Sequence, residues 1–116
     1  MTGKFGAFLR RIKVEKDFRL RPVAEKTGIS LTYLSDIFHS RRLPPDREKL
    51  ELLASALDLT QAERYEMYDA AAMDREEVPV DLAGYIMDES MPDLRAVLRT
   101  AKSLGVDNAF WKRLVL

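Results

Sequence analysis

The sequence predicts an all-α fold. Apolar residues recur at helical spacing along most of the chain, beginning with Phe5, Leu9 and Ile12. No segment shows the two-residue alternation and β-branched enrichment of a strand, and no Asn-Gly or Asp-Gly pair is present to close a hairpin. Residues that cap or end helices separate the apolar stripes. These observations predict five helices in residues 4–72 and two or three more after them.

The first three predicted helices are short and closely spaced. A stripe from Phe5 to Ile12 gives the first, and Phe18 begins the apolar set of the second. Gly28 suits the position just after a helix, where a backbone with positive φ is often needed. Ser30 is then placed to cap a third helix, expected to run from about Leu31 to His39.

The fourth and fifth helices begin at clear capping residues. The Pro44-Pro45 pair interrupts the chain, and Asp46 caps the helix that follows. Thr60 with Glu63 has the spacing of a capping box that opens the fifth helix. An acidic linker is expected at residues 73–80, with its carboxylates solvated rather than metal-binding: Asp74, Glu76 and Glu77.

A helical extension is expected over residues 81–116. Asp81 is placed to cap a short helix, Ser90 and Asp93 form a possible capping box around Pro92, and Asp107 caps a last helix. Its apolar stripes exceed what three short helices can bury on one another. They therefore pack on the fifth helix or form a dimer or partner interface, for which four side chains are candidates: Leu98, Phe110, Trp111 and Leu114.

Charge is unevenly distributed, although 19 basic and 19 acidic residues cancel. Residues 1–42 carry ten bases and four acids, a net +6. Residues 43–89 carry a net −9, and residues 90–116 a net +3. The neutral total therefore does not argue against a polyanionic partner, because the basic N-terminal segment is where nucleic acid would bind.

Several classes of protein are excluded by composition. The absence of cysteine removes disulfides, thiolate metal sites and cysteine nucleophiles. No run of 18 apolar residues is available to span a membrane, and the N-terminus does not read as a secretory signal. With one histidine and no phosphate-cradling glycine loop, an enzyme, a metal or a cofactor is not expected. A cytoplasmic location is expected.

The most informative segment is Leu20–Phe38, which reads as two short helices joined at a tight turn. Ala24 is small where two helix backbones must approach closely. Gly28, four residues later, permits the turn, and Leu34 and Ile37 direct the second helix back onto the first. This spacing is what a helix-turn-helix requires mechanically.

Residues 4–59 resemble the lambda-repressor-like helix-turn-helix domain, also called the Cro-type or XRE family. The matching segments are GAFLRRIKVEKDF, VAEKTGIS, TYLSDI and RRLPP followed by LELLASALDL, in that order. The resemblance implies a five-helix domain whose third helix enters the DNA major groove. It also implies the function of a transcriptional regulator, phage repressor or antitoxin.

The residues of the predicted DNA-binding surface fall into two groups. Candidates for base contacts lie on the third helix: Thr32, Tyr33, Ser35 and Asp36. Candidates for phosphate contacts flank it: Arg19, Arg21, His39, Arg41 and Arg42. A carboxylate at Asp36 suits the amino group of cytosine. Tyr33 has two open alternatives, stacking on the DNA backbone or packing on a neighbouring helix.

The segment departs from the family pattern at functional positions. Arg19 replaces the usual Ser or Thr cap of the second helix, which favours a phosphate partner for this cation. Asp36 is repelled by phosphates unless it finds a donor. Phe38 replaces a frequent glutamate that pairs with the first-helix arginine, so Arg10 is expected to stay solvated or bind elsewhere.

The sequence therefore favours a sequence-specific DNA-binding regulator, a repressor, that acts as a homodimer on double-stranded DNA carrying an inverted repeat. The alternative is a protein-interaction module or antitoxin that uses the same fold and binds a protein partner through residues 81–116.

Overall fold

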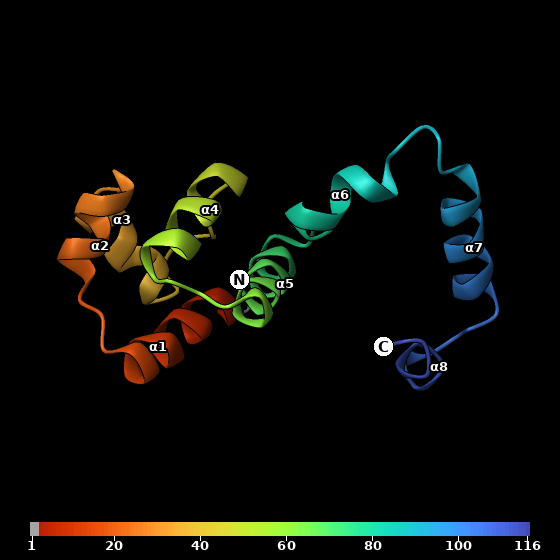
Figure 1. Ribbon diagram of the computed structural model, residues 1–116, viewed down its shortest axis with the longest axis horizontal. Coiled ribbons are helices and arrows are strands. Elements are labelled where there is room, and N and C mark those ends of the chain that lie inside the picture. The colour runs from red at the N-terminus through yellow and green to blue at the C-terminus, as the bar shows by residue number, and fades with distance from the viewer. Residues whose placement is uncertain (1–2) are drawn as a thin grey trace. The chain divides into compact units, whose positions relative to one another are not determined.

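The computed structural model describes residues 3–116, and the regular structure in this range is entirely helical (Figure 1). The chain divides into two compact units, one ending at Asp81 and the other spanning Leu82–Leu116. The expectation of an all-α fold is confirmed. The helices are α1 (Lys4–Lys16), α2 (Leu20–Thr27), α3 (Leu31–Phe38), α4 (Arg47–Ala56), α5 (Gln61–Arg75), α6 (Val80–Ile86), α7 (Pro92–Ser103) and α8 (Asn108–Lys112).

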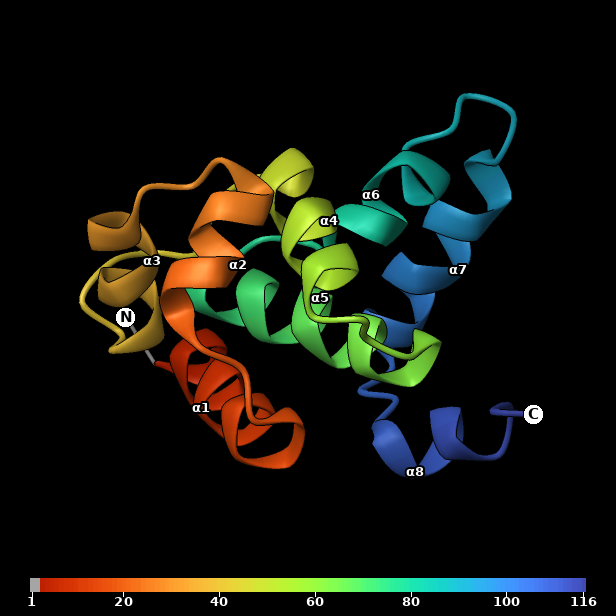
Figure 2. The ribbon, with the colours of Figure 1, turned by 60° about the vertical axis from the view of Figure 1, so that its left-hand side comes forward.

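The first unit is built around α1 and α5. Helix α1 packs against α3 and α5, and α2 packs against α3 and α4 (Figure 2). The predicted apolar stripes form its core. The large helical side chains that are almost fully buried there include Phe5, Leu9, Ile12, Leu34, Ile37, Leu50, Leu53 and Met67. Burial of this apolar surface is the main force that holds α3 in place.

The turn between α2 and α3 depends on two residues. Gly28 lies at φ 72°, and its N–H donates to the carbonyl of Ala24 at 3.0 Å. The hydroxyl of Thr27, which is buried, donates to the carbonyl of Val23 at 2.8 Å and accepts from the N–H of Ile29 at 3.3 Å. Thr27 therefore supplies an acceptor for the N–H of Ile29, which an apolar side chain at this position could not do.

Helix α1 receives its N-terminal cap from the other end of the unit. Its own N-cap position, Gly3, offers no side chain. The carboxylate of Asp74 instead accepts from the N–H groups of Lys4 at 3.0 Å and Phe5 at 2.9 Å. Asp74 is buried, with 7% of its surface exposed, so the expectation of a solvated linker carboxylate was wrong for this residue.

The end of α5 explains this difference. Helix α5 continues through residues 73–75, which the sequence assigned to the linker, so only residues 76–79 lie between α5 and α6. Arg75 in the last turn donates through Nη1 to the carbonyl of Pro44 at 2.8 Å. The last turn of α5 therefore belongs structurally to the first unit.

A close approach joins α1 to α3. A Cβ added to Gly6 would meet the hydroxyl of Ser40 and lie 3.0 Å from the carbonyl oxygen of Ile37. One turn further on, Arg10 donates through Nη1 to the carbonyl of Phe38 at 2.6 Å. Of the two alternatives left open for Arg10, binding elsewhere is the one observed, because the Phe38 backbone supplies an acceptor although its side chain does not.

The helix starts in the C-terminal part of the chain agree only in part with expectation. Asp107 caps α8 by accepting from the N–H of Ala109 at 3.1 Å, as predicted. Asp81 lies in the first turn of α6 and does not precede it. The prediction of a capping box at Ser90 was wrong, because the Ser90 hydroxyl donates to Asp88 at 2.6 Å and Met91 occupies the N-cap position of α7.

The second unit has no buried core of its own. None of residues 82–116 is buried, whereas the first unit buries a large apolar set. A groove of about 420 Å³ runs between α7 and α8 and is lined mainly by apolar side chains, including Val97, Leu104, Phe110, Trp111 and Leu114. Among residues 3–116, no helix has both the length and the apolar character needed to cross a membrane.

Candidate nucleic-acid interface

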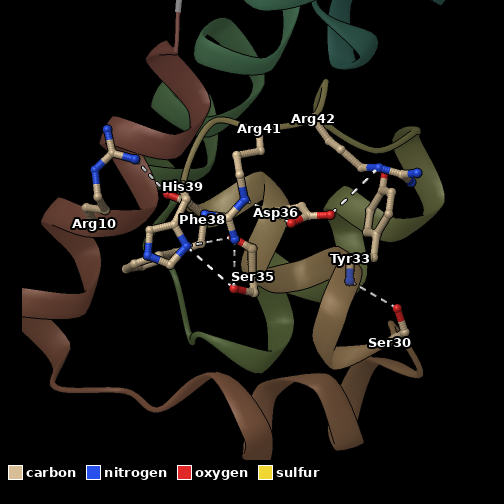
Figure 3. Close-up of polar contacts among 9 residues, drawn as sticks. All are labelled: Arg10, Ser30, Tyr33, Ser35, Asp36, Phe38, His39, Arg41 and Arg42. Carbon is tan, nitrogen blue, oxygen red and sulfur yellow. Dashed lines mark hydrogen bonds and ion pairs between the residues drawn. The ribbon is translucent and has the colours of Figure 1, made fainter.

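The orientation of α3 is set by its N-terminal cap and by the side chains that it buries. Ser30 caps the helix by accepting from the N–H of Tyr33 at 3.1 Å, as predicted (Figure 3). Leu34 and Ile37 are almost fully buried and fix the rotation of α3 about its axis. Thr32 is therefore exposed, and Ser35 is half-buried on the outer side.

Asp36 lies between two arginines that follow the helix (Figure 3). Its carboxylate accepts from Arg41 Nε at 3.0 Å and has Arg42 Nε at 3.9 Å. Ser40 has a φ of 59° and reverses the chain, so that the backbone N–H of Arg41 donates to the carbonyl of Asp36 at 2.7 Å. The carboxylate expected to be repelled by phosphates thus has a cationic partner within the protein.

Ser35 connects Arg41 to the end of α3. Arg41 Nη2 donates to the Ser35 hydroxyl at 3.4 Å. His39 Nδ1 lies 2.9 Å from the carbonyl oxygen of Ser35, so this nitrogen carries the proton and donates. His39 is exposed, and only its Nε2 remains available to an outside ligand.

Tyr33 is half-buried and packs against the core of the first unit. The guanidinium of Arg42 and the ammonium of Lys49 both lie 5.4 Å from the centre of its ring. These contacts favour the packing alternative for Tyr33 over stacking on DNA, because both cations occupy its ring faces. Lys49 was missed by sequence reasoning, since no local pattern places a residue of α4 against α3.

The start of α2 presents two further cations. Arg19 occupies the N-cap position of α2 and makes no side-chain hydrogen bond there, as expected where arginine replaces a capping Ser or Thr. Arg19 and Arg21 are both exposed, and neither forms an ion pair with any other residue between positions 3 and 116. A cation near a helix N-terminus is unfavourable unless an anion offsets it, which makes these side chains suitable for phosphate.

Two short helices joined at Gly28, with a polar outer face on α3 and a basic rim, define a helix-turn-helix protein. A family model described as a helix-turn-helix domain matches residues 4–67, more than half of the chain. The chain belongs to this family, of the XRE/Cro-like kind, which confirms the resemblance seen in the sequence. Comparisons with curated proteins and with solved structures give no match.

Membership of this family suggests DNA binding, and its members are typically not enzymes. The geometry of the surface agrees with DNA binding. Polar side chains on the outer face of α3 can reach base edges, and the arginines beside them can neutralise phosphates.

Proposed function

We propose that the protein is a sequence-specific DNA-binding transcriptional regulator that represses by occupying an operator. The observation that carries this proposal is the arrangement of α3, whose buried residues Leu34 and Ile37 turn Thr32 and Ser35 outward between cationic residues. In this function α3 lies in the major groove, where each base pair presents a distinct pattern of donors and acceptors.

The cations around α3 form two groups, one at the start of α2 and one at the end of α3. Arg19 and Arg21 are exposed at the start of α2 and are placed to bind phosphates. Arg42 is held over Tyr33, and His39 keeps Nε2 free at the end of α3, so both suit the backbone at the other end of the helix. Phosphate contacts of this kind fix the orientation of the protein without reading sequence.

The first prediction concerns retention on random duplex DNA as salt is raised. Affinity should fall steeply, because each neutralised phosphate contributes about −0.9 to the slope of log K against log salt. The double variant Arg19→Gln/Arg21→Gln should reduce that slope by about 2. Arg11→Gln is the matched control, since Arg11 is already paired with Glu66 at 2.7 Å. Absence of retention by the native protein at low salt would contradict the proposed function.

The second unit supports assembly into a homodimer. Its four candidate residues, Leu98, Phe110, Trp111 and Leu114, are exposed or half-buried, and the last three line the groove between α7 and α8. A unit without a buried core gains stability by covering such a groove. Two α3 helices would then read half-sites about 34 Å apart in an inverted repeat.

The second prediction is that Leu114→Asp weakens the dimer at least about tenfold, because a carboxylate would be buried in an apolar contact. Val115→Asp is the matched control, since Val115 is the next residue, 78% exposed, and does not line the groove. Sedimentation equilibrium measures the dissociation constant of the dimer for each variant. Equal dissociation constants for the two variants would contradict this interface.

A second candidate function is favoured by the same groove. A protein that stays monomeric at all concentrations would leave the groove for a protein partner, as in the antitoxin alternative. The first unit would then bind DNA while the second binds the partner.

A further inference from the structure

We propose that Arg41 reads a guanine base in the major groove and that Asp36 is a positioning residue that orients it. This inference rests on the proposed DNA-binding function and deepens it by naming the base that is recognised. It replaces two sequence-based expectations, a phosphate contact for Arg41 and a cytosine contact for Asp36.

The geometry fixes one edge of the Arg41 guanidinium. Nε donates to Asp36 Oδ1 at 3.0 Å, and Nη2 donates to the Ser35 hydroxyl at 3.4 Å (Figure 3). The backbone adds a third restraint, because the Arg41 N–H donates to the carbonyl of Asp36 at 2.7 Å. The side chain therefore lies back over α3, beside residues that face the major groove in the proposed complex.

The end of the guanidinium remains available for a ligand. An arginine has five N–H donors, and two of those on Arg41 are used by Asp36 and Ser35. The three that remain include one on each terminal nitrogen, and these two point in parallel from the end of the group. Such a pair matches the O6 and N7 acceptors of guanine, which is the commonest specific contact of arginine in DNA.

Charge favours a base over a phosphate at this position. The Asp36 carboxylate, 3.0 Å from Nε, offsets the positive charge of Arg41. A phosphate brought to Arg41 would be repelled by that carboxylate, whereas the neutral edge of guanine would not. Because Asp36 is already engaged with Arg41 and faces Arg42 on its other oxygen, it has less capacity to accept from cytosine.

Arg42 provides the internal comparison. It lies 3.9 Å from the other carboxylate oxygen of Asp36, and its guanidinium is held over the ring of Tyr33. Its exposure, 59% of the side chain, is close to the 57% of Arg41. The two neighbouring arginines thus differ in orientation rather than in accessibility, and Arg42 stays a phosphate contact.

The third prediction is tested on a duplex selected from a random pool with the native full-length protein. Each guanine of the selected half-site is replaced in turn by 7-deazaguanine, which lacks the N7 acceptor. At one position the replacement should lower the affinity of the native protein about five- to tenfold. This loss is smaller than the full discrimination of a bidentate contact, because only one of its two acceptors is removed. Arg41→Gln and Asp36→Ala should both be insensitive at that position, whereas Arg42→Gln should bind more weakly overall but keep the full sensitivity.

Each outcome decides a separate question. If the native protein selects no site, the proposed function fails. If it selects a site and Arg41→Gln keeps the 7-deazaguanine sensitivity, only the guanine assignment fails. If Asp36→Ala keeps the sensitivity while Arg41→Gln loses it, Asp36 does not position Arg41. Melting temperatures of all variants should lie close to that of the native protein, because these side chains are at the surface.

Discussion

Replacing Asp74 with alanine should lower the free energy of unfolding of the first unit by about 2–4 kcal/mol. Asp74 accepts from the N–H groups of Lys4 and Phe5, and no side chain at Gly3 can replace it as the cap of α1. Alanine at this position removes two charge-assisted hydrogen bonds and leaves the N–H of Phe5 buried without its acceptor. The melting temperature should fall by about 10 °C or more.

Thermal and urea unfolding, followed by circular dichroism, measure this loss on the full chain. Asp69→Ala is the matched control, because Asp69 lies on the same helix but is exposed. Desolvation, with repulsion from Asp81, raises the pKa of the Asp69 carboxyl, so its charge adds no stability to the fold. A loss for Asp74→Ala no larger than that for Asp69→Ala would show that the long-range cap contributes little.

Replacing Gly6 with valine should destabilise the first unit by about 1–3 kcal/mol and weaken DNA binding as well. The added Cβ would press on the backbone carbonyl of Ile37 and displace Ser40. The end of α3 would then move away from α1, which also stretches the bond from Arg10 to the carbonyl of Phe38. The change therefore reaches the residues after α3 that face DNA in the proposed complex.

Ala7→Val is the control for Gly6→Val. Ala7 is the next residue of α1 and is exposed, so valine there costs only its lower helix propensity, about 0.5 kcal/mol. Unfolding in urea and a DNA-binding titration should separate the two variants on both measurements. Similar stabilities for the two would mean that the α1–α3 contact accommodates a larger side chain.

Local signals in the sequence predicted the elements that carry the site. Ser30, Asp46 and Thr60 each cap the helix that follows them, and the Thr60–Glu63 capping box is complete. The backbone bond from Thr60 to the Glu63 side chain lowers the pKa of that carboxyl. Gly28 ends α2 at positive φ as expected. These features depend on residues three or four apart, which a single sequence displays directly.

The predictions that failed depend on partners that the sequence does not place together. Asp74 finds its donors 69 and 70 residues away, so composition alone made it look like part of a solvated linker. Ser90 is a different case, because its hydroxyl donates to Asp88, only two residues away, and Met91 occupies the N-cap position of α7. Gly6 was an available hint of the close contact between α1 and α3, since glycine inside a helix costs about 1 kcal/mol relative to alanine.

The pairing of Asp36 with Arg41 lies between these cases. The residues are five apart, but the pairing requires the chain reversal at Ser40, where φ is 59°. Serine at positive φ is uncommon and carries no clear sequence signal. The types of residue on the proposed DNA-binding surface were therefore predictable, whereas the way in which they orient one another was not.

The cap supplied by Asp74 also affects how the protein is made. A ribosome adds about 5–20 residues per second, so the first residue of α1 is synthesised about 4–14 s before the carboxylate that caps it. During that interval the N–H groups of Lys4 and Phe5 lack this acceptor, as they would in a chain that stops at residue 72. Helix α1 thus receives its cap only after nearly all of α5 has been synthesised.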